Sequence, residues 1–208
     1  MKKLSKKTQT KKVPFSKLSP DKKKVAIARD VLEQIRIGRY ISKSGSYISN
    51  LIMKNGDDRY KIFHKDIKSN FGQIKKCEVC AMGACLMSIT KFENKLTFDD
   101  IGGSMKELKN SKTQELFQSI FSPEQLLLME RAFEGDTGGT TVGVHIFGLF
   151  EEDFQKKIRK CQRFYDKFSN QKKYTTSEER QKQNGLNQEN RLIAIMRNLI
   201  KNKGTFIP

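Results

Sequence analysis

The sequence predicts a mainly α fold: a single compact helical domain of five or six helices with little β-structure, plus a basic N-terminal tail. The 208 residues, of which 36% are hydrophobic and 31% charged, suit one domain. Apolar residues recur at helical spacing in several segments, and helix start and stop signals separate these segments. We therefore expect a disordered tail over residues 1–18 and a helical domain over residues 19–208.

The expected tail is rich in Lys, Ser and Thr and has few apolar side chains. Because it cannot bury enough apolar surface to offset the entropy lost on ordering, we expect it to be disordered when free. The first helix should begin at Ser19, with Pro20 in its first turn, and end at Gly38. Residues 39–75 carry repeated turn signals, which predict one or two short helices at most and no strand.

The segment from Cys77 to Phe92 is apolar on nearly every side, which predicts a helix at the centre of the fold. Gly83 lies inside it, although a glycine in a helix interior costs about 1 kcal/mol relative to alanine. We expect this glycine to allow the close approach of a neighbouring helix, with which a leucine at this position would clash.

Further helices are predicted in the second half of the chain. Ser122 and Gln125 form a capping box around Pro123, so a helix should begin there and end at Gly135. The other expected elements are a helical stretch through Leu108, Leu116 and Ile120, a glycine-rich loop over 138–143, a short strand or buried turn over 142–150, a helix from Glu151 to Phe168, a polar linker over 169–185, and a last helix from Asn187 to Gly204.

The net charge of +18 is concentrated in two segments. Residues 1–24 carry ten Lys and one Asp, and residues 156–183 carry ten basic and three acidic side chains, whereas residues 25–155 are close to neutral. Concentrated basic segments indicate contact regions for a polyanion, with a solvated tail as the alternative for the first segment.

Basic side chains in both segments are the candidate nucleic-acid-binding residues, because such cations contact phosphates and release counterions. Phe164, Tyr165 and Tyr174 would add stacking faces if they were exposed, although aromatic residues at helical spacing more often belong to a core. The candidate basic residues are Lys2, Lys3, Lys6, Lys7, Lys11, Lys12, Lys156, Lys157, Lys160, Arg163, Lys167, Lys172 and Lys173.

Cys77 and Cys80 form the candidate metal site. A structural zinc site needs four ligands and usually has a second cysteine pair, which this chain lacks. The remaining ligands would have to come from Cys85, Cys161, His64 and His145. The alternative is that the cysteines are small buried hydrophobic residues. Redox chemistry would need a strand before the first cysteine, and residues 73–76 show no strand pattern. We expect no cofactor, with zinc as the alternative.

Other catalytic patterns are incomplete. The GDTGGTTVG segment lacks the spacing and the lysine of a phosphate-binding P-loop. A Ser or Cys nucleophile would need a histidine base, and the chain has only two histidines. The residues therefore favour a non-enzymatic protein.

No apolar run reaches the roughly 18 to 20 residues of a membrane span, and the first residues lack the apolar stretch of a secretory signal. We therefore expect a cytoplasmic protein without membrane contact, whose four cysteines stay reduced or bind metal.

Three segments carry a resemblance to known proteins: VAIARDVLEQIRIGRY at Val25–Tyr40, CEVCAMGA at Cys77–Ala84, and ENRLIAIMRNLIKNKGTFIP at Glu189–Pro208. They are similar to a group of small uncharacterised phage and bacterial proteins that share a C-x-V-C-A-x-G-A helix and a C-terminal RLIAIM-type helix ending in GTF. The segments cover about 44 of the 208 residues, in the expected order. The resemblance implies a shared helical core and a phage setting within a bacterial host, but no reaction.

These observations together predict a non-enzymatic, phage-related basic protein. Its expected partner is nucleic acid or a nucleoprotein assembly, contacted through the two Lys- and Arg-rich segments. One alternative is a phage-encoded inhibitor or structural partner of another protein. A further alternative is a zinc protein built on the cysteines.

Overall fold

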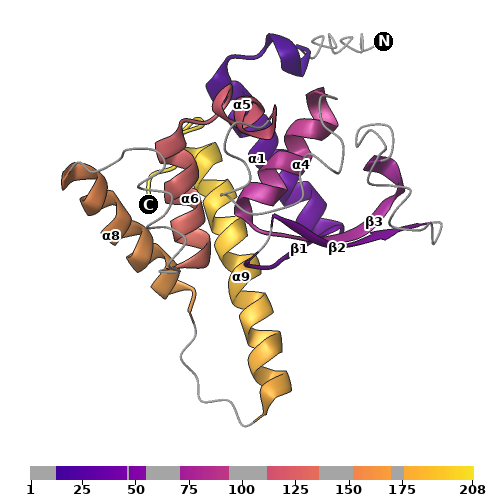
Figure 1. Cartoon of the computed structure of the whole chain (residues 1–208), viewed down its shortest axis with the longest axis vertical. Coiled ribbons are helices and arrows are strands. Elements are labelled where there is room, and N and C mark those ends of the chain that lie inside the picture. The colour runs from indigo at the N-terminus through magenta and orange to yellow at the C-terminus, as the bar shows by residue number, and fades with distance from the viewer. Residues whose placement is uncertain (1–12, 46, 55–70, 94–111, 136–151, 170–175) are drawn as a thin grey trace, which may run out of the picture.

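The computed structural model describes residues 13–45, 47–54, 71–93, 112–135, 152–169 and 176–208. Within these ranges the fold is mainly helical with a small three-stranded sheet, as predicted (Figure 1). The elements in chain order are a 3₁₀ turn at Phe15–Lys17, α1 at Pro20–Arg36, β1 at Tyr40–Ser42, β2 at Ile48–Met53, a 3₁₀ turn at Phe71–Gln73, β3 at Ile74–Val79, α4 at Ala81–Glu93, α5 at Lys112–Gln118, α6 at Pro123–Glu134, α8 at Glu152–Lys167 and α9 at Ser177–Lys201.

Helix α4 lies at the centre of the fold, as its composition predicts. Every residue from Ala81 to Thr90 is buried, and the helix contacts α1, α6 and the sheet. The predicted start at Cys77 is wrong, because Ile74–Val79 forms strand β3 and the helix begins only at Ala81. A continuous apolar run fits a buried strand as well as a buried helix, so periodicity could not separate the two.

The sheet contradicts the prediction that residues 39–75 contain no strand. Strand β3 lies in the middle of the sheet, parallel to β1 and antiparallel to β2. Tyr40 pairs with Cys77 in the parallel ladder, and the ladder with β2 is irregular between Ser49 and Ile52. These strands are short, so pairing with distant segments stabilises them more than local propensity does.

Gly83 is tightly packed, as expected, but against a different neighbour. A Cβ atom built at Gly83 would lie 1.7 Å from the backbone carbonyl oxygen of Tyr47. Tyr47 precedes β2, and its carbonyl oxygen also accepts a hydrogen bond from the backbone N–H of Cys80 at 3.4 Å. The close neighbour is therefore a segment next to the sheet and not a helix.

Two helix starts were predicted at the correct residues. Helix α1 begins at Pro20 after Ser19, and α6 begins at Pro123 after Ser122. The Ser122 Oγ atom accepts a hydrogen bond from the backbone N–H of Gln125 at 3.2 Å. The other half of the predicted capping box is not made, because the Gln125 side chain donates to the carbonyl oxygen of Gly204 at 3.3 Å.

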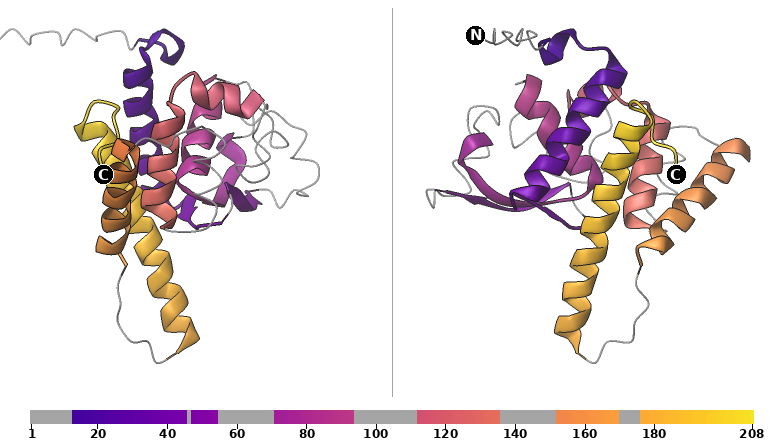
Figure 2. Two further views of the ribbon diagram at one scale, coloured as in Figure 1. Left: turned by 60° about the vertical axis from the view of Figure 1, so that its left-hand side comes forward. Right: turned by 180° about the vertical axis from the view of Figure 1, so that it is seen from behind.

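Helix α9 begins at Ser177, well before the predicted start at Asn187, so part of the expected linker is helical. A capping box of Thr176 and Glu179 starts it, with the Glu179 backbone N–H donating to the Thr176 hydroxyl at 3.1 Å. Figures 1 and 2 show that this end of α9 projects beyond the rest of the molecule. Asn187 is instead the first residue of α9 that is buried.

The structure describes only part of the expected disordered tail. Within residues 13–18, Phe15 stacks on Phe92 of α4 with ring centroids 4.5 Å apart. These six residues are therefore ordered against the body, because Phe15 finds an aromatic partner there. Residues 1–12 lie outside the described residues, as do the first part of the helical stretch before α5 and the whole 138–150 region.

Candidate polyanion interface

Helix α8 separates its apolar and basic residues onto different faces. Phe154 and Cys161 are buried against α6, and the Cys161 thiol donates a hydrogen bond to the carbonyl oxygen of Leu128 at 3.3 Å. The buried face therefore fixes the rotation of α8, and the basic residues between these positions face outward.

A line of cations runs along the outer face of α8. Lys156, Lys160, Arg163 and Lys167 follow one another at intervals of four, three and four residues, and all four side chains are exposed. This spacing places them on one side of the helix over a length of about 16 Å, at steps of about 5.5 Å. We call these four residues the α8 stripe. Four of the predicted basic residues are thus brought together.

Ion pairs occupy part of this basic surface. Lys156 lies 3.3 Å from carboxylate oxygens of Glu152 and Asp153, and Lys157 lies 2.5 Å from Glu124 of α6. Within the described part of the chain, neither Lys160 nor Arg163 lies at ion-pair distance from an acidic side chain. Lys167 lies at ion-pair distance from no acidic side chain of the described residues either, so the positive charge of the α8 stripe is least balanced from Lys160 to Lys167.

The two basic segments of the sequence meet at one pocket. Lys24, from the first segment, lines it together with Lys157 and Lys160 from the second. The pocket has a volume of about 410 Å³ and lies between α1, the start of α6, α8 and residues 205–208. Figures 1 and 2 show the C-terminal segment beside α6 and α8. Lys2, Lys3, Lys6, Lys7, Lys11, Lys12, Lys172 and Lys173 lie outside the described residues.

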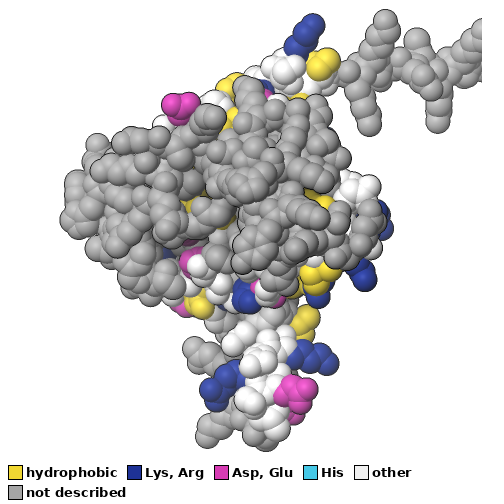
Figure 3. Space-filling model, turned by 45° about the vertical axis from the view of Figure 1, so that its right-hand side comes forward, with side chains coloured by type: hydrophobic (Ala, Val, Ile, Leu, Met, Phe, Trp, Pro, Cys, Tyr) yellow, Lys and Arg dark blue, Asp and Glu magenta, His cyan; other side chains and the backbone are white. Residues whose placement is uncertain are grey.

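The projecting end of α9 has a different surface from the α8 stripe. Arg180 and Lys182 are exposed there, as are Glu178 and Glu179. Figure 3 shows dark blue and magenta side chains next to one another on this end. Because its charges are mixed, this end has less to attract a polyanion than the α8 stripe has.

The aromatic residues Phe164 and Tyr165 of α8 are half-buried and pack against other side chains of the protein. The Phe164 ring lies 5.7 Å from the ring of Phe206, and the Tyr165 ring carries the guanidinium of Arg191 at 4.2 Å. These contacts support the core alternative over the base-stacking prediction for both rings. Tyr174 lies outside the described residues.

The two candidate metal ligands are deeply buried in different elements. Cys77 lies in β3 and Cys80 between β3 and α4, and both are at most 2% exposed. Burial raises the pKa of the Cys77 thiol to about 12, against the opposing effect of Arg39, and burial also raises the pKa of Cys80. Both thiols are therefore neutral at pH 7 unless a metal binds.

The surroundings of these cysteines do not complete a metal site within the described residues, where no group of three or more His, Cys, Asp or Glu side chains could hold an ion. His64 and His145 lie outside those residues, so zinc stays a prediction. The expectation that no strand precedes the cysteines is wrong, since β3 leads directly to Cys80. A buried thiol with a raised pKa is nevertheless a poor nucleophile.

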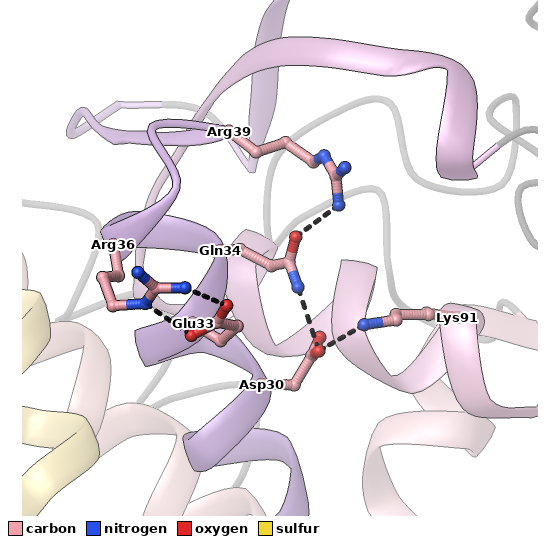
Figure 4. Close-up of polar contacts among 6 residues, drawn as sticks. All are labelled: Asp30, Glu33, Gln34, Arg36, Arg39 and Lys91. Atoms are coloured by element: carbon pink, nitrogen blue, oxygen red, sulfur yellow. Dashed lines mark hydrogen bonds and ion pairs between the residues drawn. The ribbon is translucent and has the colours of Figure 1, made fainter.

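A polar network that the sequence did not predict links α1, the start of β1 and α4 (Figure 4). Asp30 accepts hydrogen bonds from the ammonium of Lys91 and, at 3.0 Å, from the side-chain amide of Gln34. Gln34 in turn accepts a hydrogen bond of 2.5 Å from Arg39. The spacing of Asp30 and Gln34 on one helix was a visible signal, but Lys91 comes from a distant segment.

One buried oxygen of this network, Asp30 Oδ2, has no hydrogen-bond partner in the described part of the chain. The hydroxyls of Tyr40 in β1 and Ser88 in α4 are also buried, and they lie close enough to interact with each other. Burial raises the pKa of Tyr40 well above its ordinary value, and the nearby Cys77 and Asp30 add to the effect. The network therefore connects helix to sheet and keeps the Asp30 side chain largely away from water, while its partner Lys91 is 32% exposed.

Comparisons with known proteins found no relative: no family model, no curated protein and no solved structure matches the chain. The resemblance to small phage and bacterial proteins thus stays a prediction. Among the helices that the structure describes, none is long and apolar enough to cross a membrane.

Proposed function

We propose that this protein is a non-enzymatic binding protein for nucleic acid or a nucleoprotein assembly, acting in the cytoplasm of a bacterial host as a phage-related protein. The contact surface is the α8 stripe, extended by Lys157 and by the Lys-rich first segment that ends at Lys24. One observation carries the proposal: cations from both basic segments line one pocket, beside a row of exposed cations on α8.

The physical basis is the match between a row of cations and a polyphosphate backbone. Charges on one DNA strand repeat every 3.4 Å along the axis, so a line of cations about 16 Å long can reach several successive phosphates. Each contact releases condensed counterions, which makes the affinity depend strongly on salt. This mode of binding needs no base-specific contact and no catalytic group.

A pair of variants with equal charge change tests this proposal. K160Q/R163Q/K167Q removes three cations from the α8 stripe, and K54Q/K75Q/K76Q removes three exposed cations from the sheet region. The sheet and α8 lie on opposite sides of the molecule (Figure 1). Affinity for a 30-base-pair DNA, a single-stranded DNA and an RNA of equal length is measured from 50 to 300 mM salt.

We expect the α8 variant to lose affinity and to flatten the plot of log K against log salt by about 0.9 per lost phosphate contact on double-stranded DNA. The control variant should bind as the natural sequence does, apart from a small general effect of net charge. Equal losses in the two variants, or affinity that does not change with salt, would overturn the proposal. Tight binding only to a protein would favour the inhibitor alternative.

A further inference from the structure

The pocket beside Lys160 combines a charged side and an apolar side. Its charged side is formed by Lys24, Lys157 and Lys160. Lys24 is paired with Asp21 at 2.9 Å and Lys157 with Glu124 at 2.5 Å, whereas no acidic side chain of the described residues pairs with Lys160. Its apolar side includes Leu128, Phe206 and Ile207. A ligand that fits both sides has an anionic group next to a flat or apolar body, and a volume of about 410 Å³ is typical of a small-molecule site.

Ile207 is held in position at this pocket while its side chain stays exposed. Asn198 of α9 clamps its backbone: the Ile207 N–H donates to Asn198 Oδ1 at 2.9 Å, and the Ile207 carbonyl accepts from Asn198 Nδ2 at 2.6 Å. The preceding Phe206 is buried against Phe164. Ile207 is nevertheless 54% exposed, so a fixed backbone presents a large apolar side chain to solvent.

The wall of the pocket formed by the first turn of α6 is also held in place. The Gln125 side-chain amide donates to the carbonyl oxygen of Gly204, which ties the first turn of α6 to the C-terminal segment. Gly204 has a φ of +101°, and a Cβ atom there would lie 2.7 Å from the carbonyl oxygen of Asp21. The C-terminal segment is thus held against both α1 and α6, so the pocket is formed before any ligand arrives.

We propose that this pocket binds one nucleotide, free or as a unit of a bound strand, with its phosphate at Lys160 and its base or sugar against Ile207. The inference rests on the proposed function, since the pocket is part of the same basic surface and the nucleotide is the unit of nucleic acid that would bind there. A nucleotide fits because it joins a phosphate to a ring with apolar faces. Inorganic phosphate alone would use only the charged side.

Nuclear magnetic resonance titrations of the full chain with AMP, adenosine and inorganic phosphate test the inference. We expect saturable shifts of the Leu128 and Ile207 amide signals with AMP, and weaker binding of phosphate and of adenosine. I207A should lower the affinity for AMP about fivefold, because part of a large apolar contact is lost. I37A is the matched control, since Ile37 is 47% exposed at the end of α1 and should leave AMP binding unchanged.

The strand-binding assay separates the two proposals. I207A should lower the affinity for single-stranded DNA without changing its salt dependence, whereas loss of α8 cations changes the salt dependence. The nucleotide inference is overturned if phosphate binds as tightly as AMP, if AMP does not bind, or if I207A equals I37A. If these results occur while the salt dependence still follows the α8 stripe, only the pocket proposal fails.

Discussion

Helices α4 and α8 both pack against α6, but they differ in how much of their surface the protein buries. Helix α4 is buried on every side from Ala81 to Thr90, whereas α8 buries only Phe154 and Cys161 within its described length. The difference follows from composition: α4 has small and apolar residues around its whole circumference, and α8 restricts them to one face. Helix α4 therefore determines stability, and the outer face of α8 is available to a partner.

The largest effect should come from filling the closest contact of α4. G83A places a methyl group 1.7 Å from the Tyr47 carbonyl oxygen, which is a backbone atom and cannot easily move away. We expect a loss of several kcal/mol in the free energy of unfolding, enough to unfold a marginally stable domain. Urea denaturation followed by circular dichroism measures it.

G185A is the matched control for this substitution. Gly185 also lies in a helix, α9, but a Cβ atom there meets nothing within 4 Å. Alanine should therefore raise stability by about 0.5 to 1 kcal/mol through helix propensity. If G83A and G185A have similar effects, α4 is not packed against Tyr47 as described.

The next effect concerns Glu130, a half-buried acidic residue on α6, which packs against both α4 and α8. Burial raises the pKa of Glu130 to about 8, and the nearby negative charge of Glu134 adds to the shift. Because the folded pKa lies above the unfolded one, the folded state binds more protons between about pH 4.5 and 8. Stability is then fully present below this window and is lost as the pH rises through 8.

E130Q should remove this dependence on pH. Relative to the natural sequence, the variant should gain of the order of 3 to 5 kcal/mol between pH 5 and pH 9. Urea midpoints at the two pH values measure the difference. Parallel pH profiles for the two proteins would show that Glu130 is ionised in the folded state.

The smallest effect on stability should come from the outer face of α8. K160Q/R163Q/K167Q alters exposed side chains, so the free energy of unfolding should change by less than about 0.5 kcal/mol per site. The same variant should still lose affinity for nucleic acid, which separates stability from binding. A large drop in the midpoint of thermal unfolding would place these side chains in structural contacts instead.

Local signals predicted the elements that depend on local chemistry. Ser19-Pro20 and Ser122-Pro123 marked two helix starts, and the apolar composition of α4 predicted its central place. The start of α9 was missed although its Thr176 and Glu179 form a capping box, because the residues that follow are polar. A capping box defines a helix start even where no apolar stripe follows it.

Contacts between distant segments could not be predicted from the sequence. Strand β3 carries Lys75 and Lys76 among its apolar residues and depends on pairing with β1 and β2. For the candidate site, the basic residues of α8 were predicted one by one, but their meeting with Lys24 required the packing of α1 and the C-terminal segment. The position of Ile207 at the pocket had no signal in the sequence.

Burial of side chains differs between the projecting end of α9 and the rest of that helix. From Ser177 to Leu186 every residue is exposed except the half-buried Gln183, whereas Leu192 and Ile195 are fully buried. A helical end that buries little side-chain surface is only marginally stable in water. Amide hydrogens near Ser177 will therefore exchange with deuterium much faster than those near Ile195, and the helix can fray from this end while the core stays closed.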